Sequence, residues 1–197
     1  MSARQRIDLS DLLRFSISDA FGVSRAIHPT VTTLTDSPSP EVAVFRAMMS
    51  RVPALRSVSL LQLDVAAQVL TRFFVIGQWP EEVDRLGFER FNSLHLAQLR
   101  DALDLLGKSH DDVAEYTGVF VSARDALAVV LELFGRKHPE VFAAGVQHRY
   151  AVKFLAQFFE PNRTEPTEDA ILFFTGIAGL TAHFVEQLAN RYMVGTN

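Results

Sequence analysis

Apolar side chains recur at three- and four-residue intervals along most of this chain, the spacing expected of helices with one buried face. Strand-like alternation of apolar and polar residues is scarce. The pattern therefore predicts an all-α fold. Helices are expected over residues 9–27, 40–52, 60–76, 80–86, 93–107, 120–134, 139–159 and 167–193.

Helix start and stop signals divide the chain into three parts. Ser39 followed by Pro40 is a typical helix start, because serine caps the first turn and proline fits its first position. The preceding stretch, 29–40, is rich in proline, serine and threonine and is expected to form a loop. Pro161 ends a later group of helices. We expect an N-terminal helix and loop over 1–39, a core over 40–160 and an extra C-terminal helix over 161–197.

His110 is the residue that the helical pattern singles out for chemistry. It follows Leu106 by four residues, so it is expected on the same side of the helix predicted over residues 93–107, just before a corner over 111–118. Two interpretations are open. His110 is either a core histidine whose ring bonds a backbone carbonyl, or an axial ligand to a haem iron. The apolar side that it would share carries Leu96, Leu99, Leu103 and Leu106.

Composition narrows the classes of function. The chain has 197 residues, of which 48% are hydrophobic, so it can bury a substantial core. Its net charge is −4 and its basic residues form no stripe, so we expect no nucleic-acid partner. Cysteine is absent from the sequence, which excludes a disulfide framework, a thiolate metal site and a cysteine nucleophile.

The sequence predicts neither a signal peptide nor a membrane span. The N-terminus runs into Asp8 and Asp11 rather than into the apolar segment that a signal peptide requires. The longest apolar stretch, residues 171–185, has 15 residues and includes polar ones. A membrane-spanning helix needs about 20 predominantly apolar residues. We therefore expect a cytoplasmic protein without a membrane span.

Two sequence blocks have the order and spacing of a known family. The first is Phe45-Arg-Ala-Met-Met-Ser-Arg-Val-Pro-Ala-Leu-Arg56. The second is Leu105-Leu-Gly-Lys-Ser-His110, followed after ten residues by Phe120 and a long apolar helix. Both blocks resemble the globin family, of the bacterial or single-domain type. The resemblance covers roughly 40–159 and implies a globin-like helical sandwich with an additional C-terminal helix.

The resemblance implies a role for His110 as the proximal ligand of haem b. The other side of the iron would then be open to a diatomic gas, O₂, NO or CO. The implied function is gas sensing, or nitric-oxide or redox chemistry at the haem iron. The remaining positions that the resemblance places against the haem are Leu106, Phe120, Phe45, Leu70, Ala66 and Ala123.

One departure from the globin pattern supports an alternative. Globins normally carry a phenylalanine against the haem six residues after the proline, and here Ser59 follows Pro53 at that distance. Ala66, at the expected distal position, offers no hydrogen bond to a bound gas. The alternative is a haem-free globin-like sensor or protein-interaction module.

The last predicted helix has small residues among its phenylalanines. Small residues allow two helices to approach closely. The helix is therefore expected to pack on its own domain or to pair with a second copy, which would make a homodimer through the C-terminal helix. The small residues are Gly176, Ala178, Gly179 and Ala182.

Overall fold

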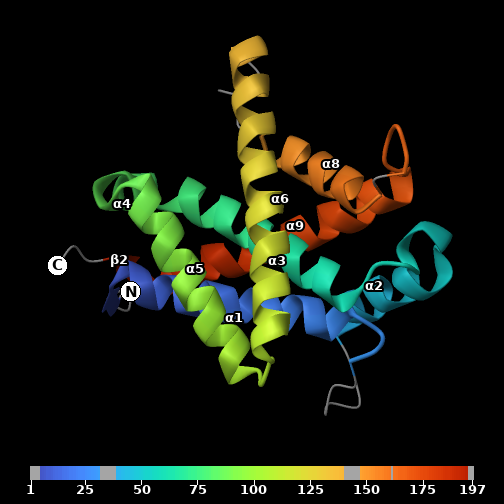
Figure 1. Cartoon of the computed structure of the whole chain (residues 1–197), viewed down its shortest axis with the longest axis horizontal. Coiled ribbons are helices and arrows are strands. Elements are labelled where there is room, and N and C mark those ends of the chain that lie inside the picture. The colour runs from blue at the N-terminus through green and yellow to red at the C-terminus, as the bar shows by residue number, and fades with distance from the viewer. Residues whose placement is uncertain (1–4, 32–38, 140–146, 161, 195–197) are drawn as a thin grey trace.

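The structure is a computed structural model that describes residues 5–31, 39–139, 147–160 and 162–194 (Figure 1). These residues form eight α-helices, one 3₁₀ turn and two short strands, so the predicted all-α class is confirmed. The helices are α1 (Leu9–Ile27), α2 (Pro40–Arg51), α3 (Leu60–Gln78), α4 (Pro80–Leu86), α5 (Phe88–Leu105), α6 (His110–Lys137), α8 (Gln147–Phe159) and α9 (Glu168–Arg191), with the 3₁₀ turn at Pro53–Leu55.

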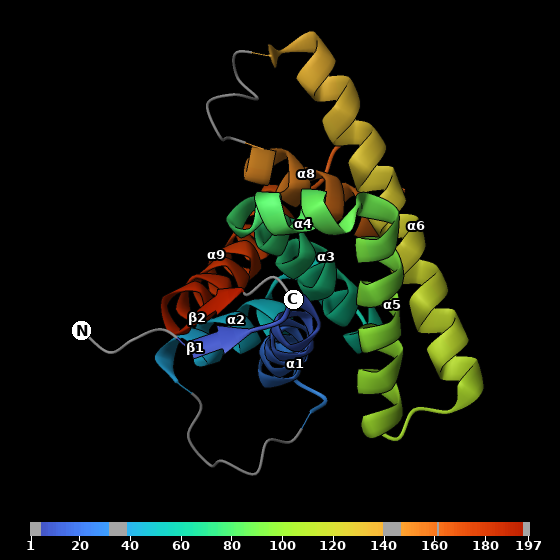
Figure 2. The ribbon, with the colours of Figure 1, turned by 90° about the vertical axis from the view of Figure 1, so that its left-hand side faces the viewer.

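Helix α3 is the centre of the molecule. It packs against α1 and α9 on two sides and against α6 on another (Figures 1 and 2). Every residue from Leu63 to Arg72 is buried, as expected of a helix that is apolar on almost all sides. Since α1 and α9 also contact each other, the predicted parts 1–39, 40–160 and 161–197 contribute to one common core.

Most predicted helices begin and end close to the predicted positions. Ser39 caps α2, as predicted, by accepting a hydrogen bond from the backbone N–H of Val42. Ser59 caps α3 in a reciprocal pair with Gln62, whose side chain accepts from the Ser59 backbone N–H. Part of the loop predicted over residues 29–40 and the start of the helix predicted at 139–159 lie outside the described residues.

The predicted corner over residues 111–118 is wrong, because these residues form the first two turns of α6. Helix α5 ends at Leu105, and two residues later Gly107 has a φ of +71°, which suits a residue without a side chain. Ser109 then caps α6 in a reciprocal pair with Asp112. His110 therefore begins the second helix of a hairpin instead of ending the first one.

The two ends of the described chain meet in a short parallel pair of strands, which the sequence pattern did not predict. Strand β1 (Gln5–Ile7) pairs with β2 (Tyr192–Val194). The ring of Phe15 on α1 stacks on Tyr192, with centroids 5.8 Å apart. The first and last helices are thereby tied together, which agrees with their shared position in the core (Figure 2).

Helix α9 uses one of its small residues within this chain. The ring of Phe45 on α2 lies over Gly176, where a β-carbon would meet its Cε1 and Cζ atoms at only 2.4 Å. The same ring contacts Phe173 edge to face. Gly176 therefore serves the packing of α2 on α9, whereas pairing with a second copy stays a prediction.

Helices α3 and α9 are also long and apolar enough, by length and composition, to cross a membrane. Of their most apolar windows, 61% of the α3 residues and 39% of the α9 residues are buried inside the protein. Core helices of soluble proteins pass the same test of length and composition.

Candidate functional site: a cleft between α3, α6 and α9

The residues that the globin resemblance places around a haem do not surround one cavity. His110 is exposed in the first turn of α6. It borders a depression of about 700 Å³ between α5 and α6, together with Arg100, Asp104 and Thr117. None of the other six residues borders this depression.

Those six residues lie in three different environments. Leu106 is exposed in the connection between α5 and α6, and Phe45 covers Gly176 on α9. The other four are fully buried within the packed core and line neither this depression nor the cleft described below: Phe120, Ala123, Ala66 and Leu70. The residues present therefore do not fit a haem held by His110.

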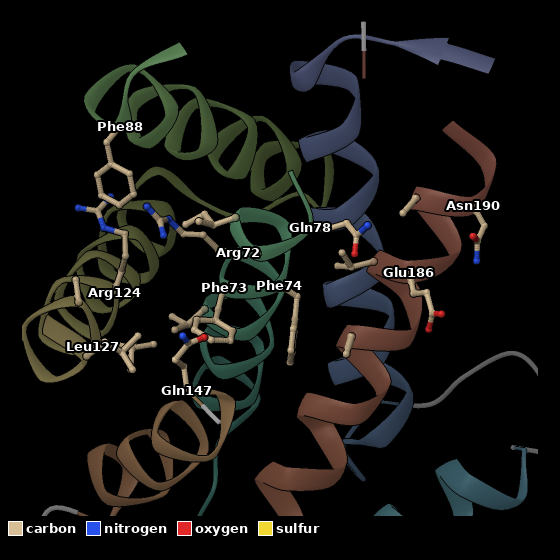
Figure 3. A pocket seen from close by; sticks show the side chains of 18 residues that line it. Arg72, Phe73, Phe74, Gln78, Phe88, Arg124, Leu127, Gln147, Glu186 and Asn190 are labelled. Carbon is tan, nitrogen blue, oxygen red and sulfur yellow. The ribbon is translucent and has the colours of Figure 1, made fainter. Parts of the chain in front are cut away.

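A larger cleft, of about 740 Å³, lies further along α6, toward its C-terminal end, where α3, α6 and α9 come together (Figure 3). Each helix presents to it one stripe of residues spaced i, i+3, i+4 and i+7, which is one face of an α-helix. The stripes are Val69, Arg72, Phe73 and Ile76 on α3, Arg124, Leu127, Ala128 and Leu131 on α6, and Ala182, Val185, Glu186 and Ala189 on α9.

The cleft has two different ends joined by apolar walls. Figure 3 shows Arg72 and Arg124 together beneath Phe88 at one end. At the other end lie side chains with amide or carboxylate oxygens, and the rings of Phe73 and Phe74 stand between the two ends. These polar side chains are Gln78, Glu186 and Asn190. A few polar groups on largely apolar walls are typical of small-molecule sites.

Arg72 is the most unusual residue of the cleft. Its side chain is only 7% exposed, and it forms no ion pair with an acidic residue in the described parts of the chain. One terminal nitrogen donates to Oδ1 of Asn92, and Nε has no hydrogen-bond partner among the described residues. The guanidinium carbon lies 5.2 Å from the ring centroids of both Phe88 and Phe91, within cation–π range.

The surroundings of Arg72 disfavour its positive charge. Burial lowers the pKa of Arg72 to about 10, and repulsion from Arg124 acts in the same direction. Arg124 itself is paired, since its Nε and a terminal nitrogen both lie 2.7 Å from Oδ1 of Asp125. The attraction of Asp125 for Arg72 is the smallest of the three effects. Arg72 nevertheless stays protonated at neutral pH, so the cleft contains a buried cation without a carboxylate partner.

His95 is buried behind Arg72. Its ring lies between Phe91, at 6.2 Å, and Phe120, at 5.2 Å between centroids. Burial, followed by repulsion from Arg72 and Arg124, lowers the pKa of His95 to about 3. The imidazole is therefore neutral at physiological pH, and its Nδ1 has no hydrogen-bond partner among the described residues.

Sequence reasoning missed the cleft, although one signal was present. The helix predicted over residues 60–76 is the most apolar of the predicted helices, and it carries only two charged side chains, Asp64 and Arg72. A charged side chain in a helix of leucines, valines and phenylalanines is expected to be buried, and a buried charge is expected to have a partner or a ligand that compensates it. What the sequence could not give was the alignment of the stripes on three separate helices.

Comparisons with known proteins identify no relative. No family model, no curated protein and no solved structure matches the chain. Within the described residues, no group of three or more histidine or acidic side chains is placed to hold a metal ion. The resemblance to globins thus stays a prediction, and the cleft is the site on which a function can be argued.

Proposed function

We propose that this chain is a haem-free helical module that binds an apolar small molecule in the cleft between α3, α6 and α9. The single observation that supports this is the cleft itself, about 740 Å³ bordered mainly by aliphatic and aromatic side chains. Volumes of about 300–1,000 Å³ are usual for sites of drug-sized ligands. Removing apolar surface from water on both partners supplies the affinity, at roughly 25 cal/mol per Å².

A neutral apolar dye tests this proposal directly. N-phenyl-1-naphthylamine is expected to bind with rising fluorescence and to reach saturation at one dye per chain. Trp79 is the sole tryptophan of the chain, is 7% exposed and directly follows Gln78, which borders the cleft. Its emission, excited selectively, is expected to change with the same midpoint as the dye signal.

Two glycines provide a matched pair of variants. Gly77 on α3 borders the cleft, and a β-carbon there meets no atom within 4 Å. Gly77→Phe is therefore expected to fill the cleft and to weaken dye binding at least about tenfold, since the dye and the ring compete for the same volume. Gly22→Phe on α1, at an equally open and exposed position of a helix that does not border the cleft, is the control. Equal binding by both variants would place the dye elsewhere and contradict the proposal.

Haem b on His110, with a diatomic gas as its ligand, is the competing function. Haemin is expected to give no Soret shift at stoichiometric concentration, because His110 is exposed and the other predicted contacts lie elsewhere. A stoichiometric Soret band that His110→Ala abolishes would overturn the haem-free proposal. A cytoplasmic location stays a prediction of the sequence.

A further inference from the structure

We propose that the natural ligand of the cleft is an organic carboxylate with an apolar body, and that Arg72 binds its acid group. This inference rests on the proposed function, because it names the chemical class of the ligand for the same site. It is carried by the combination of an apolar cleft with a buried guanidinium that has no acidic partner in the described chain.

The first step is the cost of the buried charge. A charged group taken out of water is strongly unfavourable unless an opposite charge and hydrogen bonds compensate it. Arg72 receives one hydrogen-bond acceptor, the side-chain amide oxygen of Asn92, and the faces of two phenyl rings. The Asn92 amide and the phenyl rings carry no net charge, and the nearby carboxylate of Asp125 is paired with Arg124. Arg72 therefore has no direct contact with a negative charge among the described residues. A bound carboxylate would supply it.

The second step is geometry. A guanidinium presents five N–H donors in a planar fork that matches the two oxygens of a carboxylate. The contacts with Phe88 and Phe91 and the bond to Asn92 restrain this plane. Nε is itself buried and has no hydrogen-bond partner among the described residues, so the hydrogen-bonding capacity of the guanidinium is not fully used within the chain. Arg124 borders the same end of the cleft and adds a second positive charge there. An incoming carboxylate thus finds donors that are already oriented.

The third step is the direction in which the ligand lies. In Figure 3 the two arginines occupy the end of the cleft near Phe88, and Glu186 lies at the opposite end. An acid group beside Glu186 would be repelled, whereas one beside Arg72 is attracted. The apolar body then lies along Phe73 and the aliphatic side chains of α6. A ligand with a positive end would need the reverse arrangement and is disfavoured by both arginines.

A matched pair of compounds tests the acid group. The naphthalene body of 2-naphthoate and 2-naphthamide is the same, and only the acid carries a charge at neutral pH. By calorimetry, the wild-type protein is expected to bind the naphthoate about tenfold or more tightly than the amide, as charge-assisted hydrogen bonds imply. Decanoate and decanol form a second pair that shows whether a flexible body is accepted as well.

Three variants assign the preference to Arg72. Arg72→Met is expected to weaken binding of the naphthoate at least about tenfold and to bring the acid-to-amide ratio to about one. Arg72→Lys keeps a charge without the planar fork and is expected to keep part of the preference. Arg90→Met removes an exposed positive charge on α5 outside the cleft, and it is expected to keep the full preference.

A stability measurement separates binding from structure. Without ligand, Arg72→Met is expected to unfold at a higher denaturant concentration than the wild type, because a buried unpaired charge is replaced by an apolar chain. A residue with a merely structural role would give the opposite result. Equal affinity of the wild type for acid and amide would overturn the inference and leave the proposed function standing. Failure of every compound and of the neutral dye to bind would overturn both.

Discussion

Asp64 and Arg72 are the two charged side chains of α3, and both are buried for different reasons. Asp64 faces α1, where the Ser24 hydroxyl donates to its Oδ1 and a terminal nitrogen of Arg25 lies 3.6 Å from its Oδ2. Burial nevertheless dominates and raises the pKa of Asp64 to about 6. The effects that lower it are smaller and come from Ser24, Arg25, Lys108 and His28.

The raised pKa of Asp64 makes a prediction for stability. The folded state holds this proton more tightly than the unfolded state, whose carboxyl pKa is 3.8. The stabilisation is fully present below pH 3.8 and is lost as pH rises to about 6, a total of roughly 3 kcal/mol. Asp64→Asn removes this term. Between pH 4 and 6, its free energy of unfolding is expected to rise relative to wild type as pH increases, as urea denaturation would measure.

His95 predicts the opposite slope. The folded state excludes its proton, so the stabilisation is fully present above pH 6.5 and is lost as pH falls toward 3. His95→Phe keeps a ring between Phe91 and Phe120 and removes the titrating group. Relative to wild type, this variant is expected to lose stability as pH rises from 4 to 6, by about 1.4 kcal/mol per pH unit. A difference that does not vary with pH would mean that His95 is protonated in the folded protein.

At the scale of elements, two glycines of α9 make contrasting predictions. Alanine favours a helix over glycine by about 1 kcal/mol. At Gly179 nothing obstructs a β-carbon, so Gly179→Ala is expected to stabilise the protein by up to that amount. At Gly176 the ring of Phe45 stands in the way, and overpacking costs about 1–3 kcal/mol, so Gly176→Ala is expected to destabilise the protein.

A second substitution checks that the cause is the ring. In the presence of Phe45→Leu, which withdraws the atoms that the new β-carbon would meet, Gly176→Ala is expected to become neutral or stabilising. Thermal unfolding of the four proteins of the cycle measures the coupling. Additive effects would show that alanine at position 176 destabilises the protein for another reason, for example through a change in α9 itself.

The helices themselves could largely be predicted from the sequence, because each carries its own periodicity and its own caps. The sequence pattern predicts the corner between α5 and α6 at residues 111–118, whereas α5 ends at Leu105 and α6 begins at His110. Gly107 and the Ser109–Asp112 pair are signals in the sequence for the observed break. The corner is predicted too late because His110 continues the four-residue spacing of the preceding leucines, and periodicity alone does not detect a change of helix. Strands β1 and β2 could not be predicted, since three residues carry no pattern and the partner is at the far end of the chain.

The cleft could be predicted least of all. The sequence predicts each stripe on α3, α6 and α9 as one face of a helix. Apolar helix faces usually pack together and leave no space, so the stripes alone do not predict a cleft. Whether three such faces meet or stand apart is decided by the crossing of the helices, which the sequence does not display. The same holds for four of the predicted haem-contact positions, because Ala66, Leu70, Phe120 and Ala123 are apolar helix residues that close packing buries completely.

For the whole molecule, the two titrations combine. Near pH 5 the folded protein holds about one proton more than the unfolded chain at Asp64 and about one fewer at His95. The two slopes are opposite in sign and similar in size there, so together they largely cancel. The wild type is thus expected to show only the pH dependence that its other ionisable groups produce in this range.

The double variant Asp64→Asn/His95→Phe tests the cancellation. It is expected to run parallel to the wild type in a plot of unfolding free energy against pH, while the single variants diverge from it in opposite directions. The pKa of Asp64 depends on burial and on residues around α1, and that of His95 on burial and the two arginines of the cleft, so the effects have separate origins and should add. A double variant whose curve follows either single one would show that the two buried groups are not independent. Binding of a carboxylate beside Arg72 is then expected to act on one of them alone, because a negative charge there offsets the repulsion that helps to keep His95 neutral.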